Sequence, residues 1–250
     1  MLKDFFTQQL KLNFAGQPHI TRGELFDFYR SYEPNLKEAT FGWRVYALKA
    51  KNLIKPIRKG VYTLSVKAEF HPLIDPRLKE FATKLSQKFP LVRYCVWNTK
   101  WLNEWMIHQP GKFLMMVEAE ASVVESVFYF LKDNNYKNVF INPNNDLVER
   151  YIYEESETLI IKSLVSKAPI TMEGKISVPL VEKLLVDLYI DKKLFTPFQG
   201  NELVQIYNYV YKHYSLNITT LLAYAKRRTN DRELLDFIKR NTQLTELLSL

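Results

Sequence analysis

The strongest constraint on folding in this sequence is a pair of short β-prone runs joined by a basic turn. The runs cover residues 53–57 and 61–64, and Arg58, Lys59 and Gly60 lie between them. Glycine tolerates the left-handed backbone that a tight turn needs, and two such runs on either side of it are typical of a β-hairpin. The sequence therefore predicts a hairpin whose tip is basic.

Three amphipathic helical patterns precede this hairpin. They cover residues 2–13, a segment that opens with the capping box Thr21 and Glu24 and ends at Pro34, and residues 35–51. Three helices followed by a hairpin is the element order of a winged helix-turn-helix. In that fold the third helix enters the major groove of DNA, while the hairpin is placed to reach the neighbouring phosphates.

The charge of the chain is concentrated in the same region. Residues 1–67 contain twelve Lys or Arg and five Asp or Glu, a net charge of +7, whereas the remaining 183 residues carry a net +1. A basic segment on a nearly neutral body is typical of a polyanion-binding module. The residues predicted to contact DNA are Thr40, Arg44, Lys51, Lys55, Arg58, Lys59 and Tyr62.

Beyond residue 67 the patterns predict an α+β protein. Residues 68–90 read as a connecting segment with a helix, and residues 91–250 as an α/β domain that ends in a helical bundle. Strands are expected at 92–97, 113–117, 139–141 and 158–165, with helices at 121–132, 180–189, 202–214, 218–227 and 232–239. The helix at 121–132 and the strands on either side of it form a candidate βαβ unit. The N-terminal winged helix would occupy residues 1–67.

Few residues suggest catalysis. The only cysteine, Cys95, lies in a predicted buried strand, the four histidines have no metal-ligand spacing, and no glycine-rich phosphate loop is present. No apolar run is long enough to span a membrane, and no secretory signal is evident. We therefore expect a cytoplasmic protein that is not an enzyme and has no cofactor or metal.

Two pairs of carboxylates keep an alternative open. Glu118 and Glu120 follow a predicted strand and could hold Mg²⁺ in a nuclease or nucleotide-transfer enzyme, although acids also suit the start of the following helix. Asp187 and Asp191 are four residues apart on a predicted helix and could share a face, with Asp187 on the solvated side. A further alternative is a winged-helix module that binds proteins.

Three stretches of the sequence resemble AbiEi-type antitoxins, the transcriptional regulators of bacterial type IV toxin–antitoxin pairs that act in phage abortive infection. The first combines Ile20-Thr21 at the start of a helix with the hairpin at 53–64. The second is the P-x-x-E-K-x-L-x-D helix at 179–189, and the third is the LL-x-YA-x-RR segment at 221–228.

The resemblance implies a protein that binds operator DNA, represses its own operon and antagonises a nucleotidyltransferase-like toxin. Whether it touches that toxin is left open, and so is a homodimer, which would suit a palindromic operator. The residues that the resemblance assigns to antitoxicity are Lys183, Asp187, Lys226, Arg227 and Arg228. The last three belong to a basic cluster that a solvated helix end would also explain.

Overall fold

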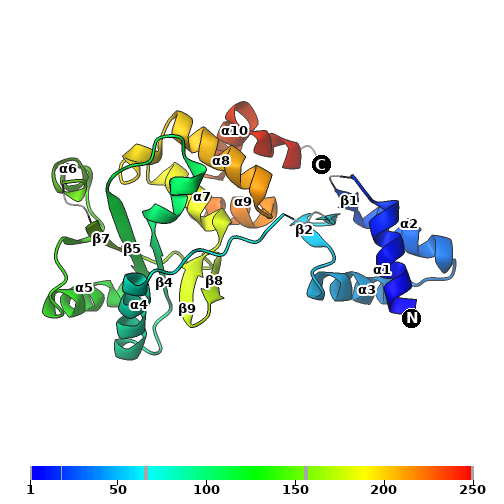
Figure 1. Ribbon diagram of the computed structural model, residues 1–250, viewed down its shortest axis with the longest axis horizontal. Helices are drawn as coiled ribbons and strands as arrows, with labels where there is room; N and C mark the ends of the chain where they lie inside the picture. Colours follow the sequence, from blue (N-terminus) through cyan, green and yellow to red (C-terminus); the bar gives the residue numbers. More distant parts are fainter. Residues whose placement is uncertain (1, 18, 65–66, 155–156, 249–250) are drawn as a thin grey trace.

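A computed structural model describes residues 2–17, 19–64, 67–154 and 157–248. The chain forms an N-terminal unit (residues 2–64) and a larger C-terminal unit (residues 67–248), which lie side by side in Figure 1. Both contain helices and strands, and the C-terminal unit ends in helices, so the predicted α+β class with a helical C-terminal region is confirmed. In the ranges described, no helix is both long enough and apolar enough to cross a membrane.

The N-terminal unit consists of three helices and a small antiparallel sheet. Its elements are α1 (Leu2–Asn13), β1 (Ile20–Thr21), α2 (Arg22–Tyr32), α3 (Glu38–Ala50), β2 (Lys55–Arg58) and β3 (Val61–Thr63). The strand order is β1-β3-β2. The predicted capping box is present, because the Thr21 side chain accepts from the Glu24 N–H while the Glu24 carboxylate accepts from the Thr21 N–H.

The predicted hairpin at 53–64 is also confirmed, and its two faces contact different parts of the protein. Gly60 has a φ of 77° in the turn, a conformation that glycine adopts without steric cost. Tyr62 and Ile54 belong to the core of the N-terminal unit. Ile57 and Val61 instead join the main core of the C-terminal unit. The hairpin is therefore shared between the two cores.

A four-stranded sheet lies at the centre of the C-terminal unit. Its strands are β4 (Tyr94–Asn98), β5 (Phe113–Ala119), β6 (Val139–Ile141) and β7 (Glu157–Ser163), in the order β4-β5-β7-β6. Strand β4 is antiparallel to β5, whereas β5, β7 and β6 are parallel. The predicted strand–helix–strand segment exists, but β5 and β6 are not neighbours, because β7 lies between them.

Helices cover both faces of this sheet. On one face pack α4 (Pro76–Lys88) and α5 (Val124–Asp133), and on the other packs α7 (Val181–Ile190). Strand β4 shows the expected alternation, since Val96 faces the α4 side while Cys95 and Trp97 face the α7 side. Asp75 caps α4 by accepting from the Leu78 N–H.

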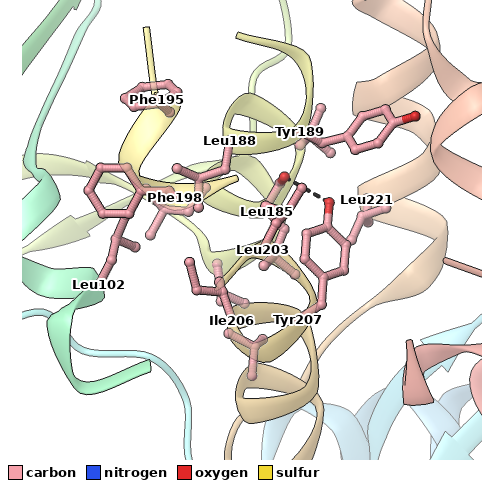
Figure 2. Packing of buried hydrophobic residues seen from close by; sticks show 14 of the residues in the cluster. Leu102, Leu185, Leu188, Tyr189, Phe195, Phe198, Leu203, Ile206, Tyr207 and Leu221 are labelled. Atoms are coloured by element: carbon pink, nitrogen blue, oxygen red, sulfur yellow. Dashed lines mark hydrogen bonds between the residues drawn. The ribbon is translucent and has the colours of Figure 1, made fainter. Parts of the chain in front are cut away.

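The C-terminal helices enclose α7. They are α8 (Asn201–His213), α9 (Ile218–Arg227) and α10 (Asp231–Asn241). Every residue from Val181 to Tyr189 is buried, and Figure 2 shows part of this packing, in which Tyr207 on α8 donates a hydrogen bond to the carbonyl of Leu185 over 2.8 Å. Helix α7 is thus the centre of the unit.

Several smaller elements complete the C-terminal unit. They are the 3₁₀ segments Thr99–Trp105, Ala121–Val123, Thr196–Phe198 and Gln243–Leu247, the helix α6 (Asn145–Leu147) and the π-helical turn Val148–Ile152. One hairpin was not predicted from the sequence, and it is formed by β8 (Ile170–Glu173) and β9 (Ile176–Pro179). Strand β9 lies against the edge of the sheet at β4.

Candidate functional site

The outward face of α3 is open to solvent. Phe41, Val45 and Leu48 turn inward and belong to the core of the N-terminal unit. On the opposite side Trp43 is 73% exposed and Tyr46 is 63% exposed, and their rings contact each other edge to face with centroids 6.1 Å apart. Neither aromatic residue is therefore part of a core. In Figure 1, α3 runs along the lower edge of the N-terminal unit, below β2.

Arg44 on α3 is engaged within the protein. Its Nη2 lies 2.9 and 2.7 Å from the two carboxylate oxygens of Glu33, the residue that ends α2. Its guanidinium also stacks over the rings of Tyr29 and Phe6, at 5.0 and 5.7 Å from their centroids. The ion pair to Glu33 and the ring contact with Tyr29 together link α3 to α2.

The other residues predicted to contact DNA differ in their exposure. Thr40, Lys51 and Lys59 are exposed, and Arg58 is half-buried. Lys55 forms a 3.1 Å ion pair with Glu69 in the connecting segment. Tyr62 is only 6% exposed and packs in the core. The structure thus places Thr40, Lys51 and Lys59 at the surface and gives Arg44, Lys55 and Tyr62 contacts inside the protein.

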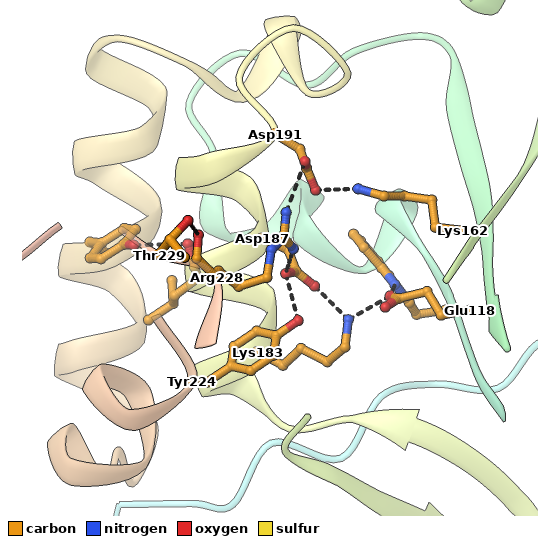
Figure 3. A network of polar contacts seen from close by, with 11 residues as sticks. Glu118, Lys162, Lys183, Asp187, Asp191, Tyr224, Arg228 and Thr229 are labelled. Carbon is orange, nitrogen blue, oxygen red and sulfur yellow. Dashed lines mark hydrogen bonds and ion pairs between the residues drawn. The ribbon is translucent and has the colours of Figure 1, made fainter. Parts of the chain in front are cut away.

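A second concentration of charge lies inside the C-terminal unit, and we call it the buried charge network. Its ionic members come from β5, β7, α7 and the turns that follow α7 and α9: Glu118, Lys162, Lys183, Asp187, Asp191 and Arg228. Figure 3 shows them in a continuous chain between the sheet and α9. Three side chains are cationic and three are anionic, so the network is formally neutral.

Lys183 is the centre of this network. Its side chain is fully buried, and its Nζ lies 2.5 Å from both Glu118 Oε1 and Asp187 Oδ2. The indole N–H of Trp97 donates to the same oxygen of Glu118 over 3.0 Å. Tyr224 donates to the other oxygen of Asp187 over 2.9 Å. Each buried charge therefore has at least two polar partners, as a charge in the protein interior requires.

The network reaches the surface through Arg228. Its Nη1 lies 2.5 Å from Asp187 Oδ1 and its Nη2 lies 3.0 Å from Asp191 Oδ1. The second oxygen of Asp191 pairs with Lys162 on β7. Lys162 and Asp191 are at the less buried end of the network, since 21% and 20% of their side-chain area is exposed.

Burial and the paired charges act in opposite directions on these groups. Burial alone lowers the pKa of Lys183, but the carboxylates of Asp187 and Glu118 outweigh it and hold that pKa well above its usual range. Burial likewise raises the pKa of Asp187, and the cations Lys183 and Arg228 outweigh it, so the net shift is downward. Both groups therefore stay ionised around neutral pH.

The buried charge network has the geometry of a structural contact that joins several elements of the C-terminal unit. The carboxylate of Glu118 is occupied by Lys183 and Trp97, while the side chain of Glu120 is exposed and accepts from the Arg93 N–H over 3.2 Å. Among the residues that the structure describes, no three His, Cys, Asp or Glu side chains gather where they could hold a metal ion. The network ties β5, β7, α7 and the end of α9 together.

The structure unites some of the residues that the resemblance assigned to antitoxicity and separates others. Lys183, Asp187 and Arg228 meet in the network, whereas Lys226 and Arg227 are exposed on α9, with Arg227 3.3 Å from the Ser166 hydroxyl. The expectation that Asp187 lies on the solvated side of its helix is wrong. Asp187 is 3% exposed, because α7 is enclosed by the sheet and by α8 and α9.

Lys162, Trp97 and Tyr224 were not predicted from the sequence as members of one site. One signal did exist, since residues 180–190 are apolar on every side apart from three charged residues and a helix of that kind is buried all round. A charge in such a helix needs buried partners. The identity of those partners depends on the register of β5 and β7, where Glu118 and Lys162 are neighbours.

These features define an α+β protein with a basic N-terminal unit and an internally neutralised C-terminal unit. The chain belongs to the DUF6577 family, described as a family of unknown function, whose model matches residues 40–244. The match begins within α3 and includes every residue of the buried charge network. No curated protein matches the chain.

Proposed function

We propose that this protein binds duplex DNA through its N-terminal unit, and that this unit is a winged helix-turn-helix. The element order, helix–strand–helix–helix–strand–strand, supports this assignment, and so does the sheet order β1-β3-β2. In such a fold α3 is the recognition helix and β2–β3 is the wing. The observation that carries the proposal is the open outward face of α3 in a unit of strongly positive charge.

Exposed lysines surround that face. Lys37 precedes the first turn of α3, Lys49 lies in its last turn, and Lys51 follows its end. Lys59 is exposed at the turn of the hairpin. Contacts between such cations and phosphates release counterions and supply most of the affinity in non-specific DNA binding.

The proposed wing has a second role. Its Ile57 and Val61 are buried against the C-terminal unit and its Tyr62 is buried in the N-terminal core, so the hairpin is accessible to DNA at its turn and not through either face. Lys59 is the residue of this hairpin that we expect to reach a phosphate. Arg44 would position α3 through Glu33 instead of contacting a base.

The resemblance to AbiEi-type antitoxins extends the proposal to autoregulation of an operon and to antagonism of a nucleotidyltransferase-like toxin. Within this extended proposal Lys183, Asp187 and Arg228 would act by holding the C-terminal unit together, because they are enclosed. Lys226 and Arg227 are exposed and would be accessible to a partner.

The proposal is tested by the salt dependence of DNA binding. We expect the full chain to bind a fluorescein-labelled duplex of mixed sequence, with an association constant that falls linearly with salt on logarithmic axes between about 50 and 200 mM. Replacing Lys49, Lys51 and Lys59 by Ala together should lower that slope by about one for each phosphate that the variant no longer binds. Fluorescence anisotropy measures both quantities.

A matched control removes three exposed lysines from the C-terminal unit. Lys79, Lys88 and Lys137 are all exposed, and replacing them by Ala changes the net charge by the same amount. This control should keep the original salt slope. Absence of duplex binding, or an equal decrease of slope in the two triple variants, would contradict the proposal.

A further inference from the structure

The outward face of α3 has an unusual composition for a helix that reads DNA. Its central exposed positions are Ala39, Thr40, Trp43, Tyr46, Ala47 and Ala50. The other exposed residues of α3, Glu38 and Lys49, lie to one side of this face, and Glu38 pairs with Arg22. Apart from the hydroxyls of Thr40 and Tyr46 and the indole N–H of Trp43, this face is apolar. Sequence readout by hydrogen bonds uses Arg or Lys on guanine, Asn or Gln on adenine, and Asp or Glu on cytosine. None of these residue types occurs at the six positions.

The one arginine of α3 does not supply the missing donors. Arg44 has Nη2 within 2.9 Å of both Glu33 oxygens, and its guanidinium stacks over Tyr29. Its release would cost both the ion pair and the ring contact. In the structure, this helix therefore offers no arginine for a bidentate contact to guanine.

Apolar side chains do recognise one feature of the major groove. The C5-methyl group of thymine projects there, and it is contacted by alanine, by the threonine methyl group and by aromatic rings. Trp43 stands 73% exposed at the middle of the face, beside the methyl group of Ala47 on the next turn. The exposed lysines around the face would hold it against the phosphates on either side of the groove.

We propose that α3 reads pyrimidine C5-methyl groups, which thymine carries in ordinary DNA, and that Trp43 is the main specificity-determining residue. This inference rests on the proposed function and deepens it. It states that the preference of α3 for particular DNA sequences comes from contact with thymine methyl groups and not from hydrogen bonds to base edges. The same chemistry would also recognise 5-methylcytosine.

The test compares duplexes that differ only in the methyl group. Alternating poly(dA-dT) is measured against poly(dA-dU), and poly(dG-dC) against its 5-methylcytosine form. Each contacted methyl group should change the affinity of the full chain by about fourfold, from the ~0.8 kcal/mol that burial of one such group supplies. Anisotropy competition at fixed salt gives the two ratios, and the second pair shows whether the methyl group of cytosine is read as well.

Variants at Trp43 separate direct contact from duplex shape. Trp43→Ala should bring the thymine-to-uracil ratio close to one, and Trp43→Phe should retain much of it, because a ring still covers the methyl group. The exposed position means that neither change disturbs the core, which thermal unfolding checks. Lys88→Ala, far from α3, should keep the full ratio.

The outcomes distinguish the two proposals. Duplex binding with a thymine-to-uracil ratio of one overturns the methyl readout and leaves DNA binding in place. A ratio that persists in Trp43→Ala overturns it as well, since the preference would then follow from duplex shape. If no duplex binds, the proposed function fails first. If Trp43→Ala changes only the oligomeric state in sedimentation velocity, the face is a self-association surface and the methyl readout is wrong.

Discussion

A fully buried lysine is costly unless its charge is neutralised, and Lys183 shows how this chain meets that requirement. Two carboxylates lie 2.5 Å from its Nζ, and both are held by further donors, Trp97 and Tyr224. Such networks contribute less to stability than their short distances suggest, because each ion has lost its hydration. Their clearest effect is that removal of one member leaves an uncompensated charge.

The pH dependence of unfolding follows from Asp187. Burial opposes its ionisation, but Lys183 and Arg228 keep its pKa below the ordinary value of 3.8. The unfolded chain therefore binds a proton at higher pH than the folded one, so this stabilisation is complete above about pH 4 and is lost as the pH falls through the folded pKa. Urea unfolding from pH 6 downward should show this loss.

Asp187→Asn should remove that part of the acid dependence, while its unfolding free energy at neutral pH is lower than that of the native chain. The exposed Asp27 on α2 provides the control, and Asp27→Asn should follow the native curve. If the Asp187→Asn variant loses stability with falling pH as much as the native chain does, the Asp187 carboxylate is not the group responsible for that loss.

At the level of elements, the network determines how α7 sits on the sheet. Lys183 connects α7 to β5 through Glu118, and Arg228 connects it to the end of α9 through Asp187. On the same helix the buried carboxylate of Glu182 accepts from the N–H of Asn217, the residue that caps α9. Polar contacts thus fix a helix whose apolar surface alone would tolerate rotation.

Removal of the central cation should loosen this arrangement. Lys183→Met leaves Glu118 buried with only the Trp97 donor, and we expect a decrease of about 3–5 kcal/mol in the free energy of unfolding. Adding Glu118→Gln should recover part of this decrease, because the amide oxygen can still accept from Trp97. Chemical denaturation monitored by circular dichroism measures both.

The matched change lies two residues beyond the end of the same helix. Lys192 is exposed, and its ammonium lies 4.8 Å from the centroid of the Tyr189 ring, so Lys192→Met should alter the unfolding free energy by no more than about 1 kcal/mol. Equal effects at positions 183 and 192 would mean that the buried ion pairs do not constrain α7.

Local patterns predicted most elements, and long-range contacts explain what they missed. The strand at Val139–Ile141 was placed correctly, as was the capping box of α2. The position of β7 between β5 and β6 could not be predicted, because parallel neighbours are separated by whole helices in the sequence. The β8–β9 hairpin did have a signal, a two-residue turn beginning with Gly174 at φ 61°.

The candidate site was less predictable than the fold. The exposure of Lys51 and Lys59 agrees with the hydrophobic pattern of the sequence. Arg44, however, pairs with Glu33, which lies eleven residues away, directly after α2. Spacing alone also could not show which side of α7 carries Asp187, because no polar stripe distinguishes the sides of that helix. Tertiary contacts decide the role of a charged residue in both cases.

At the scale of the whole molecule, the hairpin joins the two units. Ile57 and Val61 pack in the C-terminal core, while Ile54 and Tyr62 pack in the N-terminal one. Beside this junction lies a groove of about 1120 Å³ between the end of α1, β2 and the end of α8. The hairpin therefore supplies an apolar contact between the two units.

A charge placed in that contact should separate the units. Ile57→Asp would bury an unpaired carboxylate, which is costly enough to expel the hairpin from the C-terminal core. We expect a larger radius of gyration in small-angle X-ray scattering, with salt-dependent DNA binding retained. Leu12→Asp, at a position 70% exposed on α1, should leave the radius unchanged. An unchanged radius for Ile57→Asp would show that other contacts hold the units together.

The single thiol of the chain is buried on β4. Cys95 has no exposed surface, and burial raises the pKa of its sulfhydryl well above the usual range, so labelling reagents should find little to react with in the native protein. A cysteine introduced by Lys59→Cys or Trp43→Cys could then be labelled with a fluorophore at that site alone. Cys95 would not have to be replaced first. The emission of such a dye would report directly on what approaches the hairpin turn or α3.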